Sequence, residues 1–358
     1  MPSITTGKVL ATGANGFIAA HCVAHLLSSG FTVVGTVRSE AKAQKVLASH
    51  SNHPKLSVQI VSDVTKPGCF DTAIRGCDAV LHLAAPFGYA YKDFETELLI
   101  PSINGTLRIC EAAQLEPSVK RVVLTSSFAS VYDASKGLDP EKTYTEDDWC
   151  PLTYEDGKNA AATPIAYRAS KVLAEKTAWE FINSKEVMWD LVTLCPGMVF
   201  GALVSGSIAS LKELNTSNGI VWSLLDGKAV PDTKAPSKKP RTRVFKWYTD
   251  WIVWTSVTAL AKAHTQALII PEASNERFLV IDGTYDMQQL ADALHATLQI
   301  NEQTKSRIPI GQPGARIFES HYKVDGQKAR KTLGLTESNL EETTVRLVKQ
   351  LLDIEAAS

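Results

Sequence analysis

The stretch Lys8-Val-Leu-Ala-Thr-Gly-Ala-Asn-Gly-Phe-Ile-Ala19 sets the expectation for the fold. It begins with an apolar run typical of a buried strand and leads through a glycine-containing turn into a helical pattern that ends near Ser28. Gly13 permits a tight turn, Gly16 lets the backbone approach a ligand, and Ala19 is small enough for close packing between helix and strand. The free N–H groups at the start of that helix favour an anion. The stretch therefore predicts a phosphate-binding turn, with an ordinary strand-to-helix turn as the alternative.

The alternation of strand and helix continues through the first half of the chain. Short apolar runs rich in β-branched residues predict six strands: Lys8–Thr12, Thr32–Val37, Leu56–Val61, Ala79–Leu83, Arg121–Thr125 and Asp190–Leu194. Helical patterns lie between them: Gly16–Ser28, Glu40–Ala48, Cys69–Arg75, Phe94–Gln114 (with a kink or a late start at Pro101) and Pro164–Ser184. Continuous apolar strands indicate a sheet covered on both faces. We therefore expect an α/β fold with a doubly wound parallel sheet of the Rossmann type.

The second half is less regular. The segment Lys228–Phe245 contains prolines and a cationic cluster and predicts an exposed loop, whereas the aromatic residues of Trp247–Trp254 predict a helical stripe leading into an apolar helix that ends near Ile270. Arg277–Ile281 predicts a strand, and Ser338-Asn-Leu-Glu341 predicts a capping box for a last helix that ends near Ile354. We expect residues 1–195 to form the dinucleotide-binding domain. Residues 196–358 are expected to form a smaller substrate lobe, partly interleaved with it.

Composition narrows the classes of partner. The 358 residues carry a net charge of −1, with 44% hydrophobic and 21% charged residues, so no global positive field favours nucleic acid or an acidic membrane. The N-terminus lacks a signal-peptide pattern, and no apolar stretch is long enough to span a bilayer. The six cysteines are scattered, as expected for reduced core thiols, and His21, His25 and His82 lack metal-ligand spacing. We expect a cytoplasmic protein without a metal.

The end of the second strand indicates which dinucleotide is preferred. Sites that prefer NAD usually carry an acidic residue there for the ribose 2′-hydroxyl. This chain has Arg38 instead, with Lys42 one helical turn further on, and two cations suit a 2′-phosphate. NADP(H) is therefore the predicted cofactor, although Arg38 could be an ordinary solvated side chain. Asp63 and Val64 follow the third strand and are expected to border the adenine; a simple strand-end aspartate is the alternative.

Tyr167 and Lys171 form the candidate catalytic pair. Their i, i+4 spacing places them on one face of a helix, and a neighbouring ammonium would lower the pKa of the phenol. Such a pair also occurs by chance on protein surfaces. Ser126 and Ser127 directly follow the strand Arg121–Thr125, where doubly wound sheets place ligands, and a hydroxyl there can donate to a substrate carbonyl. We favour Ser127 for this role and keep Ser126 as the alternative.

Several motifs carry a resemblance to a known family. They are Thr12-Gly-Ala-Asn-Gly-Phe-Ile18, His82-Leu-Ala-Ala-Pro86, Leu124-Thr-Ser-Ser127, Tyr167-x-x-x-Lys171, Ala174-Glu-Lys176, Pro196-Gly197 and Leu214-Asn-Thr-Ser217. Together they resemble the extended short-chain dehydrogenase/reductase family. Within it, the chain is similar to the dihydroflavonol reductase-like branch, which includes fungal and yeast carbonyl, aldehyde and methylglyoxal reductases. The segment from Ala235 to Trp254 is longer and more aromatic than that branch implies.

The resemblance implies further site residues. Pro196 and Gly197 should border the nicotinamide, Ser217 should touch a phosphate, and Ala84 should lie along the dinucleotide. The full set predicted to bind the cofactor is Gly13, Asn15, Gly16, Phe17, Ile18, Arg38, Lys42, Asp63, Val64, Ala84, Tyr167, Lys171, Pro196, Gly197 and Ser217. The candidate substrate contacts, each of which could equally be a core residue, are Phe87, Tyr89, Phe128, Met198 and Trp222.

These observations favour NADPH-dependent reduction of an aldehyde or ketone to an alcohol. Tyr167 would protonate the carbonyl oxygen, Ser127 would polarise it, and Lys171 would tune the tyrosine. One alternative is a nucleotide-sugar epimerase or dehydratase, which Arg38 disfavours because such enzymes are usually NAD-linked. Another is a non-enzymatic dinucleotide-sensing regulator, which could dispense with the proton donor. The expected partner is a small carbonyl compound, and the expected state is a monomer or a homodimer.

Overall fold

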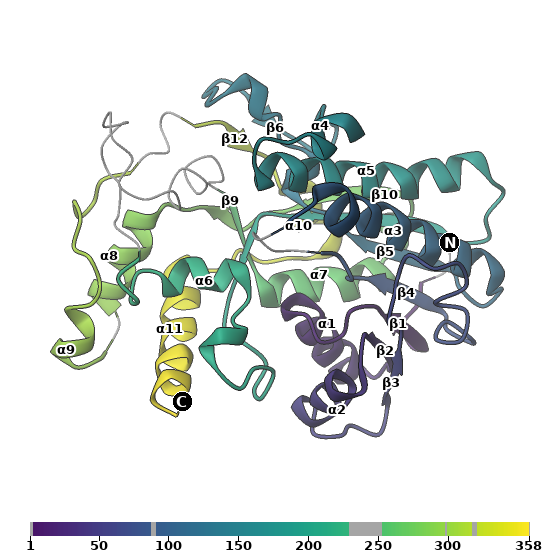
Figure 1. Cartoon of the computed structure of the whole chain (residues 1–358), viewed down its shortest axis with the longest axis horizontal. Helices are drawn as coiled ribbons and strands as arrows, with labels where there is room; N and C mark the ends of the chain where they lie inside the picture. Colours follow the sequence, from purple (N-terminus) through teal and green to yellow (C-terminus); the bar gives the residue numbers. More distant parts are fainter. Residues whose placement is uncertain (1–2, 87–90, 229–252, 298, 317–320, 358) are drawn as a thin grey trace.

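The computed structural model describes residues 3–86, 91–228, 253–297, 299–316 and 321–357. A seven-stranded sheet forms its centre, with all neighbouring strands parallel (Figure 1). In spatial order the strands are β10 (Glu276–Val280), β7 (Asp190–Pro196), β5 (Arg121–Thr125), β4 (Ala79–His82), β1 (Lys8–Ala11), β2 (Thr32–Val37) and β3 (Leu56–Ile60). The chain runs outward from β1 to β3 and then returns to β4 on the other side of β1. The predicted doubly wound parallel sheet is confirmed.

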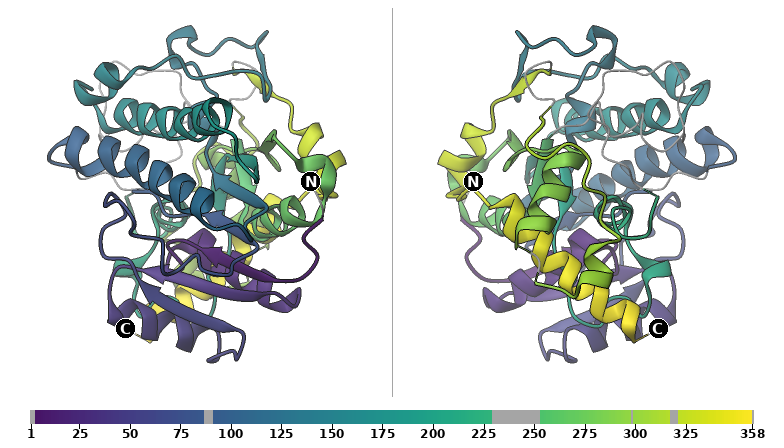
Figure 2. Two further views of the ribbon diagram at one scale, coloured as in Figure 1. Left: turned by 90° about the vertical axis from the view of Figure 1, so that its right-hand side faces the viewer. Right: turned by 90° about the vertical axis from the view of Figure 1, so that its left-hand side faces the viewer.

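Helices cover both faces of this sheet (Figures 1 and 2). One face is covered by α1 (Phe17–Ser28), α2 (Glu40–Ser49) and α7 (Val257–Ile269). The other is covered by α3 (Ile100–Leu115) and α5 (Thr163–Ser184). Proline stands in the first turn of both α3 and α5, where it removes no intrahelical hydrogen bond.

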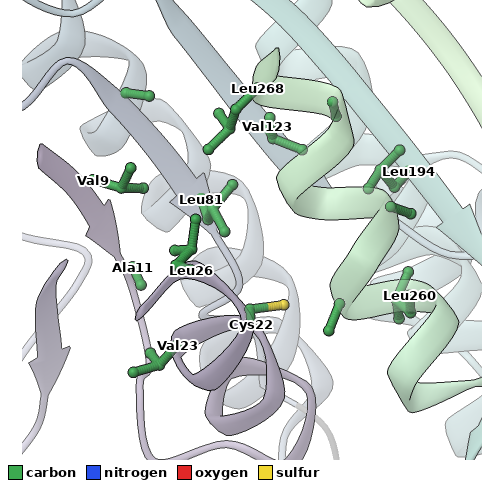
Figure 3. Close-up of a cluster of buried hydrophobic side chains, with 14 of the residues drawn as sticks. Val9, Ala11, Cys22, Val23, Leu26, Leu81, Val123, Leu194, Leu260 and Leu268 are labelled. Carbon is green, nitrogen blue, oxygen red and sulfur yellow. The ribbon is translucent and has the colours of Figure 1, made fainter. Parts of the chain in front are cut away.

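Alternate strand residues fill two separate cores. Val9, Ala11 and Leu81 face the α1 side, where they pack with side chains of α1 and α7 (Figure 3). Leu10 and Val80, their neighbours in sequence, face the α3 and α5 side. This alternation follows from the two-residue period of a strand, and it explains why the strands read as continuous apolar runs.

A third core lies beside the main sheet. It joins α6 (Thr216–Trp222), α8 (Met287–Thr297) and α11 (Leu340–Ala356) to a small sheet of β8 (Met198–Phe200), β9 (Val253–Ser256) and β11 (Gly283–Thr284). The remaining elements are η1 (Glu95–Leu99), η2 (Phe128–Ser130), η3 (Ala134–Lys136), β6 (Thr143–Tyr144), α4 (Tyr154–Lys158), η4 (Leu211–Glu213), η6 (Pro271–Ala273), α9 (Glu302–Lys305), β12 (Lys323–Val324) and α10 (Gln327–Leu333). Throughout the described ranges, no helix combines the length and hydropathy that a bilayer crossing requires.

Three predicted elements need correction. The segment Cys69–Arg75 forms consecutive turns rather than a helix, because its backbone does not keep the i→i−4 bonding pattern: the Ile74 N–H donates to the Phe70 carbonyl, but the Asp71 N–H donates to the Gly68 carbonyl. Trp254 lies on β9 rather than on a helical stripe, because its backbone pairs with Met198 and Gly283. The other aromatic residues of that stripe, like most of the predicted loop Lys228–Phe245, lie outside the described residues.

The third correction concerns a helix cap. Asn339, not Ser338, caps α11 by accepting a hydrogen bond from the Glu342 N–H at 3.0 Å, so the cap lies one residue later than predicted. The expected disturbance at Pro101 is present, because the π-helical turn η1 precedes α3 directly.

Candidate active site

The phosphate-binding turn meets the end of β4 where the strand order reverses. Gly13 has a φ of +66°, and a Cβ placed on it would lie 3.1 Å from the Ala84 Cα. Thr12 Oγ1 accepts hydrogen bonds from the N–H groups of Leu83 and Ala84, each at 3.0 Å. In open α/β sheets this reversal creates the crevice that binds ligands. The turn and Ala84 are therefore together, as the sequence predicts.

His82 completes the contacts of Thr12. Thr12 Oγ1 lies 3.0 Å from His82 Nδ1. Because the hydroxyl already accepts two hydrogen bonds, its proton is the one directed at that nitrogen. Burial lowers the pKa of His82 to about 3. The histidine is therefore a neutral acceptor that joins the ends of β1 and β4, a role that the sequence analysis did not assign to it.

The start of α1 suits a dinucleotide pyrophosphate. Gly16 occupies the N-cap position, and no side chain caps the helix, so the first-turn N–H groups stay available for an anion. Asn15 is exposed beside this turn, and Phe17 and Ile18 are half-buried in it. A Cβ on Gly16 would lie 3.2 Å from the Gly13 carbonyl oxygen, so a larger residue would narrow the cradle.

The cations predicted to bind a 2′-phosphate lie next to one another after β2. Arg38 is exposed and Lys42 half-buried. Partial burial lowers the pKa of Lys42, and the nearby charge of Arg38 lowers it further. Within the part of the chain that the structure describes, neither side chain is paired with a carboxylate. Two adjacent unpaired cations fit a doubly charged phosphate group.

Asp63 and Val64 lie on the turn after β3. Asp63 Oδ1 accepts hydrogen bonds from the N–H and the hydroxyl of Thr65, at 2.9 and 2.7 Å, and these bonds lower the pKa of the carboxyl group. Val64 lies against Gly105 of α3, where an added Cβ would be 3.3 Å from its Cγ2. Both residues are half-buried, so a contact with the adenine stays a prediction.

Three consecutive residues at the end of β5 each contact one residue of α5. Lys171 Nζ donates to the Thr125 carbonyl oxygen at 3.0 Å. The Ser126 hydroxyl donates to Glu175 Oε2 at 2.6 Å. The side chain of Ser127 lies beside the Tyr167 phenol, near enough to affect its pKa.

This arrangement separates the two candidate hydroxyls. The Ser126 hydroxyl already donates its hydrogen bond to the carboxylate of Glu175, whereas Ser127 lies beside Tyr167. Ser127 also accepts a hydrogen bond from the Ala129 N–H at 3.1 Å, which orients its side chain. The contacts therefore favour Ser127 as the hydroxyl that faces a substrate.

The pKa of Tyr167 differs from the expectation. Burial raises the pKa of the phenol above its ordinary value, and the neighbouring Ser127 side chain offsets only part of this rise. The Lys171 ammonium donates to the Thr125 carbonyl, and its effect on the phenol of Tyr167 stays a prediction. Burial also lowers the pKa of Lys171, to about 8, while the charge of Glu175 raises it. The protein alone thus keeps the phenol protonated, as a proton donor requires.

The residues after β7 have contacts within the protein. Pro196 ends β7, and a Cβ on Gly197 would lie 2.6 Å from the Val253 carbonyl oxygen, so close packing on β9 already requires glycine there. Ser217 donates its hydroxyl proton to the Val199 carbonyl at 2.5 Å and accepts from Asn215 at 2.8 Å. The Ser217 hydroxyl proton is therefore already used in a hydrogen bond within the protein. Contacts of Pro196, Gly197 and Ser217 with the cofactor stay predictions.

The candidate substrate contacts are dispersed. Phe128 has no exposed surface and stacks on Tyr132 and Tyr322, so its ring is a core element. Met198 and Trp222 belong to the third core and are 6% and 8% exposed. Phe87 and Tyr89 lie outside the described residues.

Comparison with known proteins identifies the family. The NAD dependent epimerase/dehydratase family matches residues 9–212. The chain belongs to this family. A ketoreductase of Aspergillus niger is 36% identical over 352 residues, covering 97% of this chain and 98% of that protein. An NADPH-dependent methylglyoxal reductase of Saccharomyces cerevisiae is 36% identical over 359 residues, covering 97% and 99%.

Solved structures agree with this placement. The yeast methylglyoxal/isovaleraldehyde reductase complexed with NADPH superposes with a TM-score of 0.86 at 33% identity. The match covers 98% of the present chain and 100% of the yeast chain. A related NADPH complex from Candida albicans gives 0.85 at 35% identity, covering 97% and 99%. The predicted membership of the extended short-chain dehydrogenase/reductase family is confirmed.

Proposed function

We propose that this chain reduces the carbonyl group of an aldehyde or ketone to an alcohol with NADPH. The observation that carries the proposal is the proximity of the Tyr167 phenol to the Ser127 hydroxyl at the end of β5, on the same sheet edge as the turn after β1. The NADPH-dependent reductases among its relatives support both the reaction class and the cofactor. The cations Arg38 and Lys42, neither of which pairs with a carboxylate of the described residues, disfavour the NAD-linked epimerase alternative.

The chemistry divides among three side chains. NADPH supplies the hydride that reaches the carbonyl carbon. Ser127 holds the carbonyl oxygen and stabilises the negative charge that develops on it. Tyr167 delivers its proton to that oxygen, and its buried environment keeps the proton in place until then. Lys171, one helical turn away, stabilises the phenolate that remains.

The turnover of a Tyr167 variant tests the role assigned to this residue. Tyr167→Phe removes the proton donor but keeps the ring, so we expect kcat to fall by about 10²- to 10⁴-fold with NADPH affinity almost unchanged. The measurement is NADPH oxidation with a panel of diketones, α-keto esters, aliphatic and aromatic aldehydes and flavonoid ketones. Binding is followed separately by NADPH fluorescence. Near-normal turnover by the variant would refute the role of Tyr167.

The panel also tests the reaction class. If the wild-type chain binds NADPH but oxidises it with none of these compounds, the proposed activity is wrong and the sensing alternative gains support. The cytoplasmic location and the monomeric or dimeric state stay predictions.

A further inference from the structure

Glu175 lies two turns after Tyr167 on α5 and has no exposed surface. It completes a stripe with Tyr167 and Lys171 at i, i+4 and i+8, which is one face of the helix. Each member of the stripe contacts a different residue of Thr125, Ser126 and Ser127. The end of β5 is therefore fixed to α5 at three successive points, and Glu175 supplies one of them.

The carboxylate of Glu175 has a partner for each oxygen. Arg277 of β10 donates from Nε to Oε1 at 2.8 Å and from Nη2 to Oε2 at 3.1 Å. The hydroxyl oxygens of Ser126 and Ser130 each lie 2.6 Å from Oε2. These contacts hold the pKa of Glu175 below its ordinary value despite complete burial. The group therefore carries a negative charge in the interior.

Arg277 is itself held rigidly. Its Nη1 donates to the carbonyl oxygens of Glu146 and Asp148, at 2.7 and 2.5 Å, and its guanidinium lies 3.7 Å from the centre of the Trp149 ring. The position of Glu175 is thus determined from β10, independently of any ligand. A rigid support of this kind is what precise placement of the Ser127 hydroxyl and the Lys171 ammonium needs.

We propose that Glu175 is a positioning residue of the reductase site, which anchors the end of β5 through Ser126 and supplies the negative charge that keeps Lys171 an ammonium ion. The proposal rests on the proposed function. Lys171 and Glu175 line one small cavity with Ser126 and His82, so the charge of Glu175 acts on Lys171 across a buried space.

The other charged or titratable groups near Lys171 do not replace this charge. Tyr167 on the same helix stays protonated, and burial lowers the pKa of His82 on β4 to about 3, which leaves it neutral. On β7, burial raises the pKa of the Cys195 thiol to about 12. Arg277 on β10 is positive. Glu175 is thus the source of negative charge among these groups at neutral pH.

The test is the pH profile of kcat/KM. Burial lowers the pKa of Lys171 to about 8, so we expect loss of the Lys171 proton to set the basic limb of the profile, which is the decline of kcat/KM at high pH. In Glu175→Gln that pKa falls, because the charge that raises it is gone, so the limb moves to lower pH by on the order of one unit. A shift of that size lowers kcat/KM about fivefold at pH 8 and hardly at all at pH 6.

Two variants separate charge from structure. Glu175→Asp keeps the negative charge and should leave the limb in place even if the rate falls. Ser130→Ala removes one hydrogen bond to the Glu175 carboxylate without changing the charge of that group. The basic limb of its kcat/KM profile should therefore lie at the same pH as in the wild type. NADPH affinity, measured by fluorescence at pH 6, should be similar in all three variants. A purely structural role would instead lower kcat/KM equally at every pH.

A fallback keeps the proposal testable if Glu175→Gln does not fold because Arg277 loses its partner. The double variant Glu175→Gln/Arg277→Met leaves no buried unpaired guanidinium, and its limb should move in the same direction. A limb that coincides with the wild-type limb in the folded variant would overturn the proposal. Failure of the proposed function would appear differently, as a wild-type chain that binds NADPH but oxidises it with none of the carbonyl compounds.

Discussion

Arg38 and Lys42 are the two residues that we expect to set cofactor choice. They lie next to one another after β2, and the described part of the chain provides no carboxylate partner for either. A charge-assisted hydrogen bond to a phosphate contributes about 1.5–3 kcal/mol, so the pair favours a cofactor with a 2′-phosphate over one with a hydroxyl.

Reversal of the charge at Arg38 should change this preference. In Arg38→Glu we expect kcat/KM for NADPH to fall roughly ten- to a hundredfold, because a carboxylate repels the 2′-phosphate, while kcat/KM for NADH falls less or rises. The measurement is the ratio of the two specificity constants. Lys55→Glu makes the same charge change near the amino end of β3, where it should leave the ratio unaltered. An unchanged ratio in Arg38→Glu would contradict the assignment.

Local sequence identified the residues of the site only where a motif contains them. The turn after β1, the Tyr167–Lys171 pair and Ser127 were all predicted, because each occurs in a fixed local pattern. Glu175, Arg277 and Thr12 were not assigned roles, because their contacts join segments that are far apart in sequence. The i, i+4 step from Lys171 to Glu175 was a usable signal, since it places a carboxylate on the face of α5 that carries Tyr167 and Lys171.

At the scale of elements, the hydroxyl of Thr12 links β1 to β4. In Thr12→Val the N–H groups of Leu83 and Ala84 lose their acceptor, and His82 loses its donor, without a change of side-chain shape. We expect the free energy of unfolding to fall by about 2 kcal/mol, because unsatisfied buried groups cost about 1–3 kcal/mol each. Urea unfolding measures this change. Thr12→Ser keeps the hydroxyl and is the matched control; equal stability of the two variants would argue against the link.

Elements with a strong apolar pattern were predicted within about two residues of their bounds, as β2 and β5 show. The errors arose where other forces decide. Cys69–Arg75 has a helical pattern, but its backbone mixes i→i−3 and i→i−4 hydrogen bonds and forms turns. Trp254 has the spacing of a helical stripe, yet cross-strand pairing with Met198 and Gly283 places it on β9. Such pairing joins distant segments, so a local pattern cannot reveal it.

At the scale of the whole molecule, we propose that residues 1–195 form the NADP-binding domain and 196–358 the substrate lobe. From the second half, β10 and α7 return to complete and cover the main sheet, whereas α6, α8 and α11 share the separate third core. Phe17, the first residue of α1, packs against both cores. We therefore expect a dinucleotide bound at the turn before α1 to lie close to both parts.

Two buried histidines make the stability of the whole fold depend on pH. His82 is held by Thr12, while His264 of α7 contacts the Leu260 carbonyl through Nδ1 and the Thr125 hydroxyl through Nε2, at 2.8 and 2.7 Å. Burial lowers the pKa of His82 to about 3 and that of His264 to about 4. Both values lie below the ordinary 6.5, so the unfolded chain binds more protons than the native state between these limits.

The native state should therefore lose stability as the pH falls below 6.5, and the loss should level off near the folded-state pKa values. Between pH 7.5 and pH 5 each histidine contributes about 2 kcal/mol to this loss, since one pKa unit corresponds to about 1.4 kcal/mol. Urea unfolding at both pH values measures it. In His264→Asn the group no longer titrates, so the variant, although less stable at pH 7.5, should show a decline that is smaller by about 2 kcal/mol. A decline as steep as that of the wild type would show that His264 does not remain neutral in the native state, and that other groups dominate acid unfolding.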